Sequence, residues 1–345
     1  MRREHGTVEG VSAMGPFALE PVCKDYLWGG TRLRDEWGLG GGMPRVAESW
    51  SLSAHPDGDG RILNGPCAGM TLSSALRRLP QLAPQDAPLP LMVKLIDAAL
   101  PLSIQVHPDD AYAAQHHGEE RGKTEMWYVL DRTPGAFVYL GFRHRVSRRE
   151  AGLRARDGTL PEVLRRVEVR PGEALFIPSG TVHAIGGGIL LAEVQQSSNL
   201  TYRLFDYGRL GADGRPRPLH VERALDVARL APADPTPPGA LPWQALTGGQ
   251  LRVLANCPAF RSGVLKLEGA CTIPAQRRFL SLLCLAGEAA LSGEGASLAM
   301  SRGTSLLIPA GGGACRLEGD AKLLLTSTGG GGSDNFAFTI GGINV

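Results

Sequence analysis

The sequence lacks several patterns that identify whole classes of proteins. No apolar run approaches the roughly 20 residues that a membrane-spanning helix needs. No Gly-x-Gly-x-x-Gly segment follows a predicted strand, and no Walker-type loop occurs, which argues against a dinucleotide or ATP site. The six cysteines are widely spaced and form no Cys-x-x-Cys pair. This spacing favours buried free thiols in a reducing compartment over disulfides, so we expect a cytoplasmic protein.

A surplus of charge is also missing. The 345 residues carry a formal net charge of +2, and the arginines are spread along the chain. We therefore expect neither nucleic acid nor a membrane among the partners. Residues 1–15 contain two arginines but no apolar segment of the kind found in secretory signals. We expect this stretch to be a disordered or frayed N-terminus.

The central part of the chain has the pattern of a β protein. Short apolar or alternating runs are separated by glycine, proline and other turn residues, which is typical of strands. Many short strands with such turns predict a mainly β fold, an antiparallel sandwich or barrel. The runs cover residues 91–96, 102–106, 125–130, 136–140, 174–177 and 189–194.

Three helices are expected among these strands. Residues 109–117 follow a proline and begin with aspartate, which is typical of a helix start. Ser147 and Glu150 have the spacing of a capping box, so a helix should run from there to about residue 156. Residues 220–230 repeat apolar side chains every three or four positions, as an amphipathic helix does.

A proline-rich stretch and an internal repeat divide the chain. Residues 231–239 are typical of a stiff linker. Beyond it, residues 303–311 match residues 172–180 in both glycines, the leucine and the Ile-Pro pair, but Ala314 stands where the first copy has His183. We interpret the second copy as part of a barrel without metal ligands. The expected divisions are a catalytic domain at 16–231, a linker at 232–240, a degenerate domain at 241–327 and a Gly-rich tail at 328–345.

Four side chains from distant segments suggest one metal site. Gln105 and His107 are two residues apart on a predicted strand, so both point to the same face. Glu125 opens the next apolar run, and His183 follows a Pro-x-Gly turn. A lone histidine is more often a hydrogen-bonded surface or core residue. A carboxylate, two imidazoles and an amide oxygen together suit a divalent cation of the zinc class.

The wider pattern resembles a known family. The spacing Gly172-x5-Pro178-x-Gly180-x2-His183 resembles the second motif of the cupin barrel. Further segments resemble type I mannose-6-phosphate isomerases, in their short bacterial form, over about residues 16–330. These segments are residues 28–33, 48–56, 102–112, 122–127 and 199–209.

The resemblance implies two cupin-like jelly-roll barrels with a few helices, the C-terminal one degenerate. It also implies an enzyme that holds one Zn²⁺ per chain on Gln105, His107, Glu125 and His183. Such enzymes interconvert mannose 6-phosphate and fructose 6-phosphate through a cis-enediol intermediate. The expected partner is this small sugar phosphate, and the expected assembly is a monomer or a weak homodimer.

The resemblance also implies roles for residues near the metal. Arg203 falls on the position of the catalytic arginine and would stabilise an oxyanion. Lys123 would transfer a proton or act as a second charge stabiliser. Glu193 is the other candidate for proton transfer, although it can equally be a carboxylate paired with a cation. One departure is Asn199, where some members of the family have an aspartate.

Phosphate binding is expected at Lys94, Ser103 and Arg209, because two cations and a hydroxyl can satisfy a dianion. Two other functions remain open. An iron-dependent cupin dioxygenase would use the same scaffold but usually employs more histidines. A non-catalytic sugar-phosphate-binding or regulatory paralogue would keep the pocket without turnover, and Asn199 favours this alternative.

Overall fold

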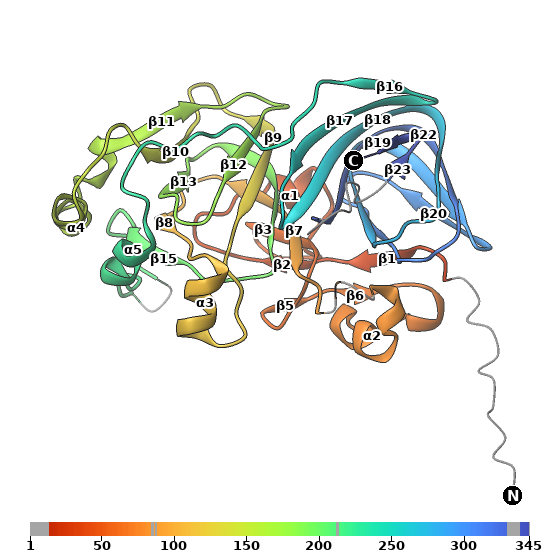
Figure 1. The fold of residues 1–345 in the computed structure, drawn as a ribbon, viewed down its shortest axis with the longest axis horizontal. Helices are drawn as coiled ribbons and strands as arrows, with labels where there is room; N and C mark the ends of the chain where they lie inside the picture. Colours follow the sequence, from red (N-terminus) through yellow and green to blue (C-terminus); the bar gives the residue numbers. More distant parts are fainter. Residues whose placement is uncertain (1–13, 84–85, 87, 212–213, 330–338, 345) are drawn as a thin grey trace, which may run out of the picture.

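The computed structural model describes residues 14–83, 86, 88–211, 214–329 and 339–344. Most of the N-terminal segment that we expected to be disordered, residues 1–13, lies outside these ranges. The chain is mainly β, as predicted, and forms two lobes that lie side by side (Figure 1). The first lobe contains the candidate site.

Two facing antiparallel sheets build the first lobe. In spatial order, the five-stranded sheet contains β11 (Leu164–Glu168), β10 (Phe137–Phe142), β13 (His183–Ile185), β8 (Ile104–Val106) and β15 (Tyr202–Phe205). The six-stranded sheet contains β12 (Ala174–Ile177), β9 (Glu125–Arg132), β14 (Ile189–Gln196), β7 (Leu91–Ala98), β3 (Glu48–Leu52) and β2 (Val22–Lys24). Side chains of both sheets meet in one apolar core, so the lobe is a jelly-roll sandwich.

One curled nine-stranded sheet builds the second lobe. Along the sheet it contains β16 (Gln244–Leu246), β17 (Gly249–Asn256), β18 (Phe260–Ile273), β22 (Cys315–Thr328), β19 (Leu280–Gly293), β21 (Ser305–Ile308), β1 (Phe17–Glu20) and β6 (Arg61–Ile62), with β20 (Ala296–Met300) paired to β19. The sheet therefore takes β1 and β6 from the start of the chain. The domain limits expected from the sequence stay a prediction, because strands from both sides of 232–240 share this sheet.

The six-stranded sheet is buried on both faces. Every residue of β7 and β14 is buried. One face packs inside the first lobe through residues such as Ile96, and the other packs on the second lobe, where Val93 joins the core of Phe260 and Leu324. This burial explains why apolar side chains occur on both faces of these strands instead of alternating with exposed polar ones. The second lobe therefore packs against the face of this sheet that is opposite the candidate site.

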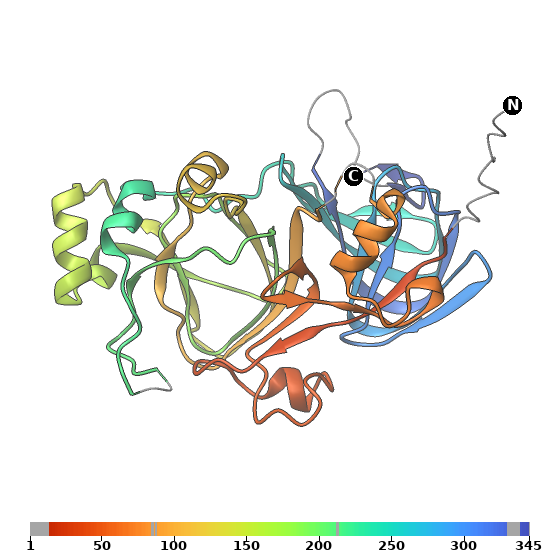
Figure 2. The same ribbon diagram turned by 90° about the horizontal axis from the view of Figure 1, so that it is seen from below.

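Helices are short and lie outside the sheets (Figures 1 and 2). They are α1 (Arg32–Asp35), α2 (Leu72–Arg78), α3 (Asp110–His117), α4 (Arg148–Asp157) and α5 (Val221–Val227), with 3₁₀ turns at Gly65–Cys67, Pro80–Leu82 and Leu160–Val163. Among the described residues, no helix is long and apolar enough to cross a membrane. Short strand pairs complete the fold: β4 (Ala54–His55) with β5 (Gly58–Asp59), and β23 (Thr339–Ile340) with β24 (Ile343–Asn344).

The predicted helices are found, with one correction. The side chain of Asp109 accepts from the Tyr112 amide at the start of α3, and the Ser147 hydroxyl accepts from the Glu150 amide at the start of α4. The third helix was predicted to reach residue 230, but α5 ends at Val227. The Arg229 amide donates to the carbonyl of Gly180 instead of continuing the helix. A tertiary hydrogen bond thus overrides the apolar periodicity.

The expected linker and tail both make contacts. In the linker, the carbonyl of Pro235 accepts from the Phe176 amide at 2.8 Å. In the tail, the Gly341 amide donates to Thr272 at 2.9 Å, and Ile340 is fully buried. The Gly-rich part of the tail, residues 330–338, lies outside the described residues. The linker is therefore an ordered strap along the first lobe.

Candidate metal centre and active site

One row of side chains crosses the five-stranded sheet. Arg203 on β15 is the register partner of Gln105 on β8, and Gln105 is the partner of His183 on β13. His107 lies two residues beyond Gln105 and therefore points to the same side. The row places an arginine, an amide and two imidazoles on one face of the sheet.

A second row crosses the six-stranded sheet. Trp50 on β3 pairs with Lys94 on β7, Lys94 with Glu193 on β14, and Glu193 with Trp127 on β9. Glu125 lies two residues before Trp127 on the same strand, so both point to the same face. Directly opposite residues in a sheet lie close enough for their side chains to interact. This row therefore concentrates ionisable groups inside the lobe.

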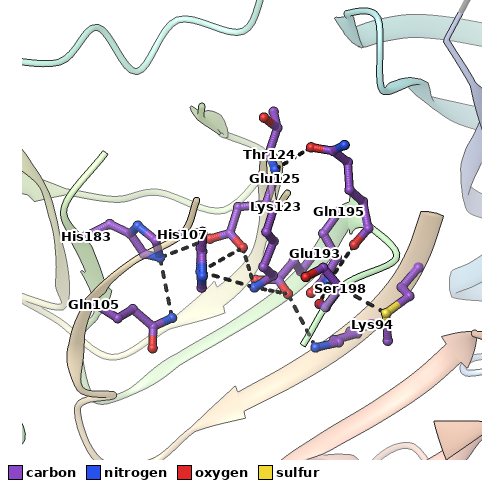
Figure 3. A network of polar contacts seen from close by, with 12 residues as sticks. Lys94, Gln105, His107, Lys123, Thr124, Glu125, His183, Glu193, Gln195 and Ser198 are labelled. Carbon is purple, nitrogen blue, oxygen red and sulfur yellow. Dashed lines mark hydrogen bonds and ion pairs between the residues drawn. The ribbon is translucent and has the colours of Figure 1, made fainter. Parts of the chain in front are cut away.

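The two rows meet at a cluster of three buried side chains (Figure 3). Potential ligand atoms of His107, Glu125 and His183 all lie within 4.8 Å of one another. Glu125 Oε1 is 3.2 Å from His183 Nε2, and Glu125 Oε2 is 3.6 Å from His107 Nε2. Gln105 Nε2 lies 3.4 Å from His183 Nε2. The structure thus brings together the four residues that the sequence nominated.

Backbone carbonyls orient both imidazoles. His107 Nδ1 is 2.7 Å from the Leu200 oxygen, and His183 Nδ1 is 2.8 Å from the Thr181 oxygen. A carbonyl oxygen can only accept, so each Nδ1 carries the proton and each Nε2 presents a lone pair to the cluster. Burial lowers the pKa of His183 to about 4 and the pKa of His107 well below its usual value. Both rings are therefore neutral and suited to bind a metal.

The turn before His183 explains its aim. Gly180 has a φ of +83°, and a Cβ there would lie 2.8 Å from the carbonyl of Val227. Only glycine tolerates this conformation and this approach. The Gly180 amide donates to the carbonyl of His107 at 2.8 Å. The turn therefore connects the segments that carry the two imidazoles.

The cluster contains more acceptors than protons. Glu125 Oε1 is buried, makes no hydrogen bond with any described residue and faces the lone pair of His183 Nε2. Burial, with repulsion from Glu193, raises the pKa of Glu125 to about 7. The ammonium of Lys123 supplies one positive charge, 2.6 Å from Glu125 Oε2 and 3.3 Å from His107 Nε2. An orphaned carboxylate oxygen beside two imidazole lone pairs fits a divalent cation.

A carboxylate and two lysines lie next to this cluster. Glu193 Oε1 is 3.7 Å from Lys123 Nζ and 3.9 Å from Lys94 Nζ, while the Trp127 indole donates to Glu193 Oε2 at 2.9 Å. Burial opposes ionisation of Glu193, but the two lysines outweigh it and lower the pKa of this carboxyl. Burial likewise opposes the charge of Lys123, but Glu125 and Glu193 raise its pKa. At neutral pH, Glu193 is therefore a carboxylate and Lys123 an ammonium.

The cluster adjoins a cavity of about 300 Å³. Most of its wall is polar, and it takes side chains from both sheets and from the segments that flank them. The lining residues include Tyr26, Trp28, Glu48, Lys94, Ser103, Gln105, Lys123, Trp127, Glu193, Asn199, Thr201, Arg203 and Arg217. A small polar molecule in this cavity would touch Gln105 and the Lys123–Glu193 pair at once.

Comparisons with known proteins identify the family. The description "Phosphomannose isomerase type I, catalytic domain" matches residues 17–130, and "Mannose-6-phosphate isomerase, cupin domain" matches residues 253–328. Mannose-6-phosphate isomerase ManA of Bacillus subtilis is 36% identical over 90% of this chain and 98% of its own length. The chain belongs to the type I mannose-6-phosphate isomerase family.

Solved structures of mannose-6-phosphate isomerases share this fold. The crystal structure of the enzyme from Bacillus subtilis matches with a TM-score of 0.85 and 31% identity, covering 91% of this chain and 99% of that one. A zinc-bound mannose 6-phosphate isomerase matches with a TM-score of 0.71 and 18% identity, over 92% of this chain and all of that one. The predicted cupin fold class is confirmed.

Not every residue nominated from the family pattern reaches the cavity. Ser103, Arg203 and Lys94 line it, but Arg209 does not. Arg209 Nη1 donates to the carbonyl of Pro101 at 2.6 Å. Lys94 lies between two carboxylates, 3.6 Å from Glu48 and 3.9 Å from Glu193. The three residues predicted to hold phosphate therefore do not form one group.

The sequence interpretation assigned no role to several polar residues that line the cavity, among them Glu48, Asn199 and Arg217. Glu48 opens the motif at 48–56, so its presence in a family segment was a usable signal. Asn199 was noted as a departure, and its amide donates to Asp57 Oδ2 at 2.7 Å. Arg217 lies between two prolines, Pro216 and Pro218. No periodicity or motif marks it, and only the fold brings it to the cavity.

Proposed function

We propose that this protein is a zinc-dependent isomerase that interconverts mannose 6-phosphate and fructose 6-phosphate. One observation carries the proposal. The lone pairs of two buried imidazoles and a buried carboxylate converge at one point, with too few protons to form hydrogen bonds among them. This cluster lies beside a carboxylate–lysine pair that lines a polar cavity. Membership of the isomerase family supplies the substrate class.

Gln105, His107, Glu125 and His183 would hold the metal. Gln105 would offer its amide oxygen, after its side-chain amide turns by half a rotation from the orientation that points nitrogen at His183. A zinc ion, when bound, polarises a sugar oxygen as a Lewis acid. We propose one ion per chain, because the described residues contain one such cluster.

Glu193 is the proposed proton carrier between C1 and C2 of the sugar. Its carboxylate lines the cavity, and the Trp127 indole fixes its orientation. The two neighbouring lysines keep it ionised, so it is ready to accept a proton. Glu193 would remove the proton from the carbon next to the carbonyl group, which gives an enediol or enediolate. It would then return this proton to the neighbouring carbon, while a second proton moves between the two sugar oxygens.

Lys123 and Arg203 are the proposed stabilisers of the charge that develops on oxygen. The raised pKa of Lys123 suits an ammonium that donates hydrogen bonds rather than a base that accepts a proton. The guanidinium of Arg203 lines the cavity, and its Nη1 donates to the carbonyl of Pro218 at 3.0 Å. Cations fixed in a buried site lower the energy of an oxyanion more than water does.

A coupled assay tests the proposal. Purified protein is stripped with a chelator and reloaded with zinc, and fructose 6-phosphate is converted onward to a product that reports its formation. We expect no turnover without metal and recovery at one zinc per chain. Binding of mannose 6-phosphate without turnover would instead support the non-catalytic paralogue. Oxygen uptake by iron-loaded protein would favour the dioxygenase.

An Arg203→Ala variant sharpens this test. We expect turnover to fall by roughly 10²-fold or more, because one fixed donor to the oxyanion is lost. Zinc content should not change, since Arg203 lies outside the metal cluster. A rise in KM at unchanged turnover would place Arg203 in substrate binding instead.

A further inference from the structure

Two guanidinium groups bind one buried carboxylate beside the cavity, and a third lies nearby. Arg217 binds Asp206 through two contacts, Nε to Oδ2 at 2.7 Å and Nη2 to Oδ1 at 2.6 Å. Arg209 Nη2 reaches the same Oδ1 at 2.5 Å. Asp206 is only 4% exposed. Arg203 lies near this pair. Burial lowers the pKa of Arg203, and repulsion from Arg217 lowers it further.

Arg217 and Arg209 differ in where they point. Arg209 Nη1 donates to the carbonyl of Pro101, and Arg209 is not among the residues that line the cavity. Arg217 lines the cavity together with Arg203 and Ser103. No hydrogen bond from Arg217 Nη1 occurs within the described ranges. Arg217 therefore offers a free donor at the cavity, whereas the Nε of Arg209, which has no partner among the described residues, is buried in a residue that does not line it.

The backbone around Arg217 is fixed to the site. Pro216 forms a bridge with Leu210, and the Pro218 carbonyl accepts from Arg203 Nη1. Two residues later, the His220 amide donates to the carbonyl of Arg203 at 2.7 Å. These contacts hold the segment against β15, so the guanidinium of Arg217 does not have to be ordered when a ligand binds.

The charges of this group call for an anion. Arg209 and Arg217 bind Asp206, and Arg203 lines the cavity beside Arg217. One carboxylate compensates one of these three positive charges, and the two that remain match a phosphate dianion. Lys94 at the other side of the cavity differs, because Glu48 and Glu193 lie within 3.9 Å of its ammonium. The attraction for phosphate is therefore concentrated at the arginines. The hydroxyl-bearing residues Ser103 and Thr201 line the same cavity.

We propose that Arg217, held in place by Asp206, anchors the phosphate of the substrate, and that Arg209 serves as a brace for Asp206. This deepens the proposed function and rests on it for the identity of the sugar. The planar guanidinium keeps one edge on Asp206 and presents its other donors to phosphate. Asp206 and Arg209 are positioning residues that do not touch the ligand.

The test compares Arg217→Gln with its matched control Arg209→Gln. KM and kcat are measured for mannose 6-phosphate, and the Kd of inorganic phosphate is measured by titration calorimetry. We expect Arg217→Gln to raise both KM and the phosphate Kd by roughly 10- to 100-fold, with kcat changed less than about threefold, because the contact is made equally in ground and transition states. Arg209→Gln should raise them by less than about fivefold.

Further variants keep the proposal falsifiable. Arg217→Lys keeps the charge but loses the bidentate contact, so its phosphate affinity should fall between those of the wild type and Arg217→Gln. Asp206→Asn should lose phosphate affinity as Arg217→Gln does, because Arg217 is no longer held in place. The loss should occur although the substitution removes a negative charge near the ligand. An equal or larger effect of Arg209→Gln than of Arg217→Gln would overturn the proposal. So would a phosphate Kd that Arg217→Gln leaves unchanged.

Failure of the proposed function gives a different result. If the wild-type protein does not isomerise mannose 6-phosphate but binds inorganic phosphate, and Arg217→Gln abolishes that binding, the anchor stands and the isomerase assignment falls. If the wild type isomerises the sugar and Arg217→Gln matches it in KM, the assignment stands and the anchor falls.

Discussion

The two lobes contain the same repeated segment but very different interiors. In the first lobe Ile177 of β12 is the register partner of Glu125, and in the second the equivalent Ile308 of β21 is the partner of Leu280. Ala314 replaces the second imidazole in the same way. Positions that present proposed metal ligands in one lobe are apolar or small in the other. The scaffold therefore does not need the ligands in order to form.

Burial energies explain the direction of this difference. A carboxylate placed in an apolar interior without a partner costs several kcal/mol, whereas a buried leucine contributes roughly 1.5–3 kcal/mol. Glu125 has an orphaned oxygen, while Leu280 is fully buried in its lobe's apolar core. The second lobe thus has the same scaffold without the destabilising burial of a carboxylate. Stability is given up for function only in the first lobe.

The largest expected effect on activity comes from substituting each lobe's residue at the end of the repeat, His183 or Ala314, with its counterpart from the other lobe. His183→Ala should strip the metal and abolish isomerase activity, because one of the two imidazole lone pairs is lost. The lobe should still fold, since one ligand contributes little to the apolar core. Elemental analysis, the coupled assay and circular dichroism measure the three outcomes. Stoichiometric zinc in His183→Ala would refute the ligand assignment.

Ala314→His is the matched control. Ala314 is exposed, so a histidine there should be tolerated. It should not create a metal site, because Leu280 supplies no carboxylate at the position of Glu125. Zinc content should stay at the wild-type value. A second bound zinc would show that the lobes differ less than their interiors suggest.

The next effect tests the carboxylate beside the metal. Glu193→Gln should lower kcat by roughly 10²- to 10⁴-fold, the usual range for loss of a general base. The amide keeps the shape and can still accept from the Trp127 indole, so KM and zinc content should change little. Exchange of substrate hydrogen with solvent deuterium, followed by NMR, should fall in parallel. Turnover with full exchange would exclude Glu193 as the proton carrier.

The next test places a carboxylate at the position in the second lobe that is equivalent to Glu125. Leu280→Glu should destabilise the protein by about 3–5 kcal/mol, as expected for an uncompensated buried charge. Leu280→Met is the control and should cost less than about 1.5 kcal/mol. In metal-free protein, Glu125→Gln should not lower stability, because burial raises the pKa of Glu125 to about 7 despite Lys123, and the glutamine oxygen can still accept from that ammonium. Urea unfolding measures all three, and a stability loss for Glu125→Gln would contradict this account.

Local patterns in the sequence were sufficient for much of the fold and for the metal cluster. Alternation along a strand put Gln105 and His107 on one face, and the Pro-x-Gly turn signalled the aim of His183. The capping residues of α3 and α4 also act locally. These features depend on neighbours in the chain, so spacing alone reveals them.

What the sequence did not reveal depends on long-range contacts. β1 crosses to the second lobe because its partner is β21, almost 300 residues away. Arg217 reaches the cavity because Asp206 and the bridge between Leu210 and Pro216 hold it there. The premature end of α5 depends on a hydrogen bond to Gly180. No periodicity encodes such pairings, because each requires that distant elements are already packed together.

The smallest expected effect concerns a cationic residue. Both lobes have one two residues before the equivalent positions Glu125 and Leu280. Lys123 precedes Glu125, and Arg278 precedes Leu280, but Arg278 pairs with the buried Asp86 at 3.0 Å. Arg278→Met should leave kcat/KM within about twofold, since Arg278 does not line the active-site cavity. It should destabilise the protein at neutral pH by about 1.5–3 kcal/mol, the usual value of a hydrogen bond to a charged group.

The pH dependence of this variant has a defined sign. Burial raises the pKa of Asp86, against the opposing effects of Thr328 and Arg278. The folded state then binds more protons than the unfolded state above about pH 4, so this group lowers stability as pH rises through its folded pKa. Loss of Arg278 raises that pKa further and widens the window. Urea unfolding at about pH 4 and pH 7 should show a larger deficit at pH 7. Equal deficits would mean that Arg278 acts through packing, and the parallel with Lys123 would then be one of position rather than of charge.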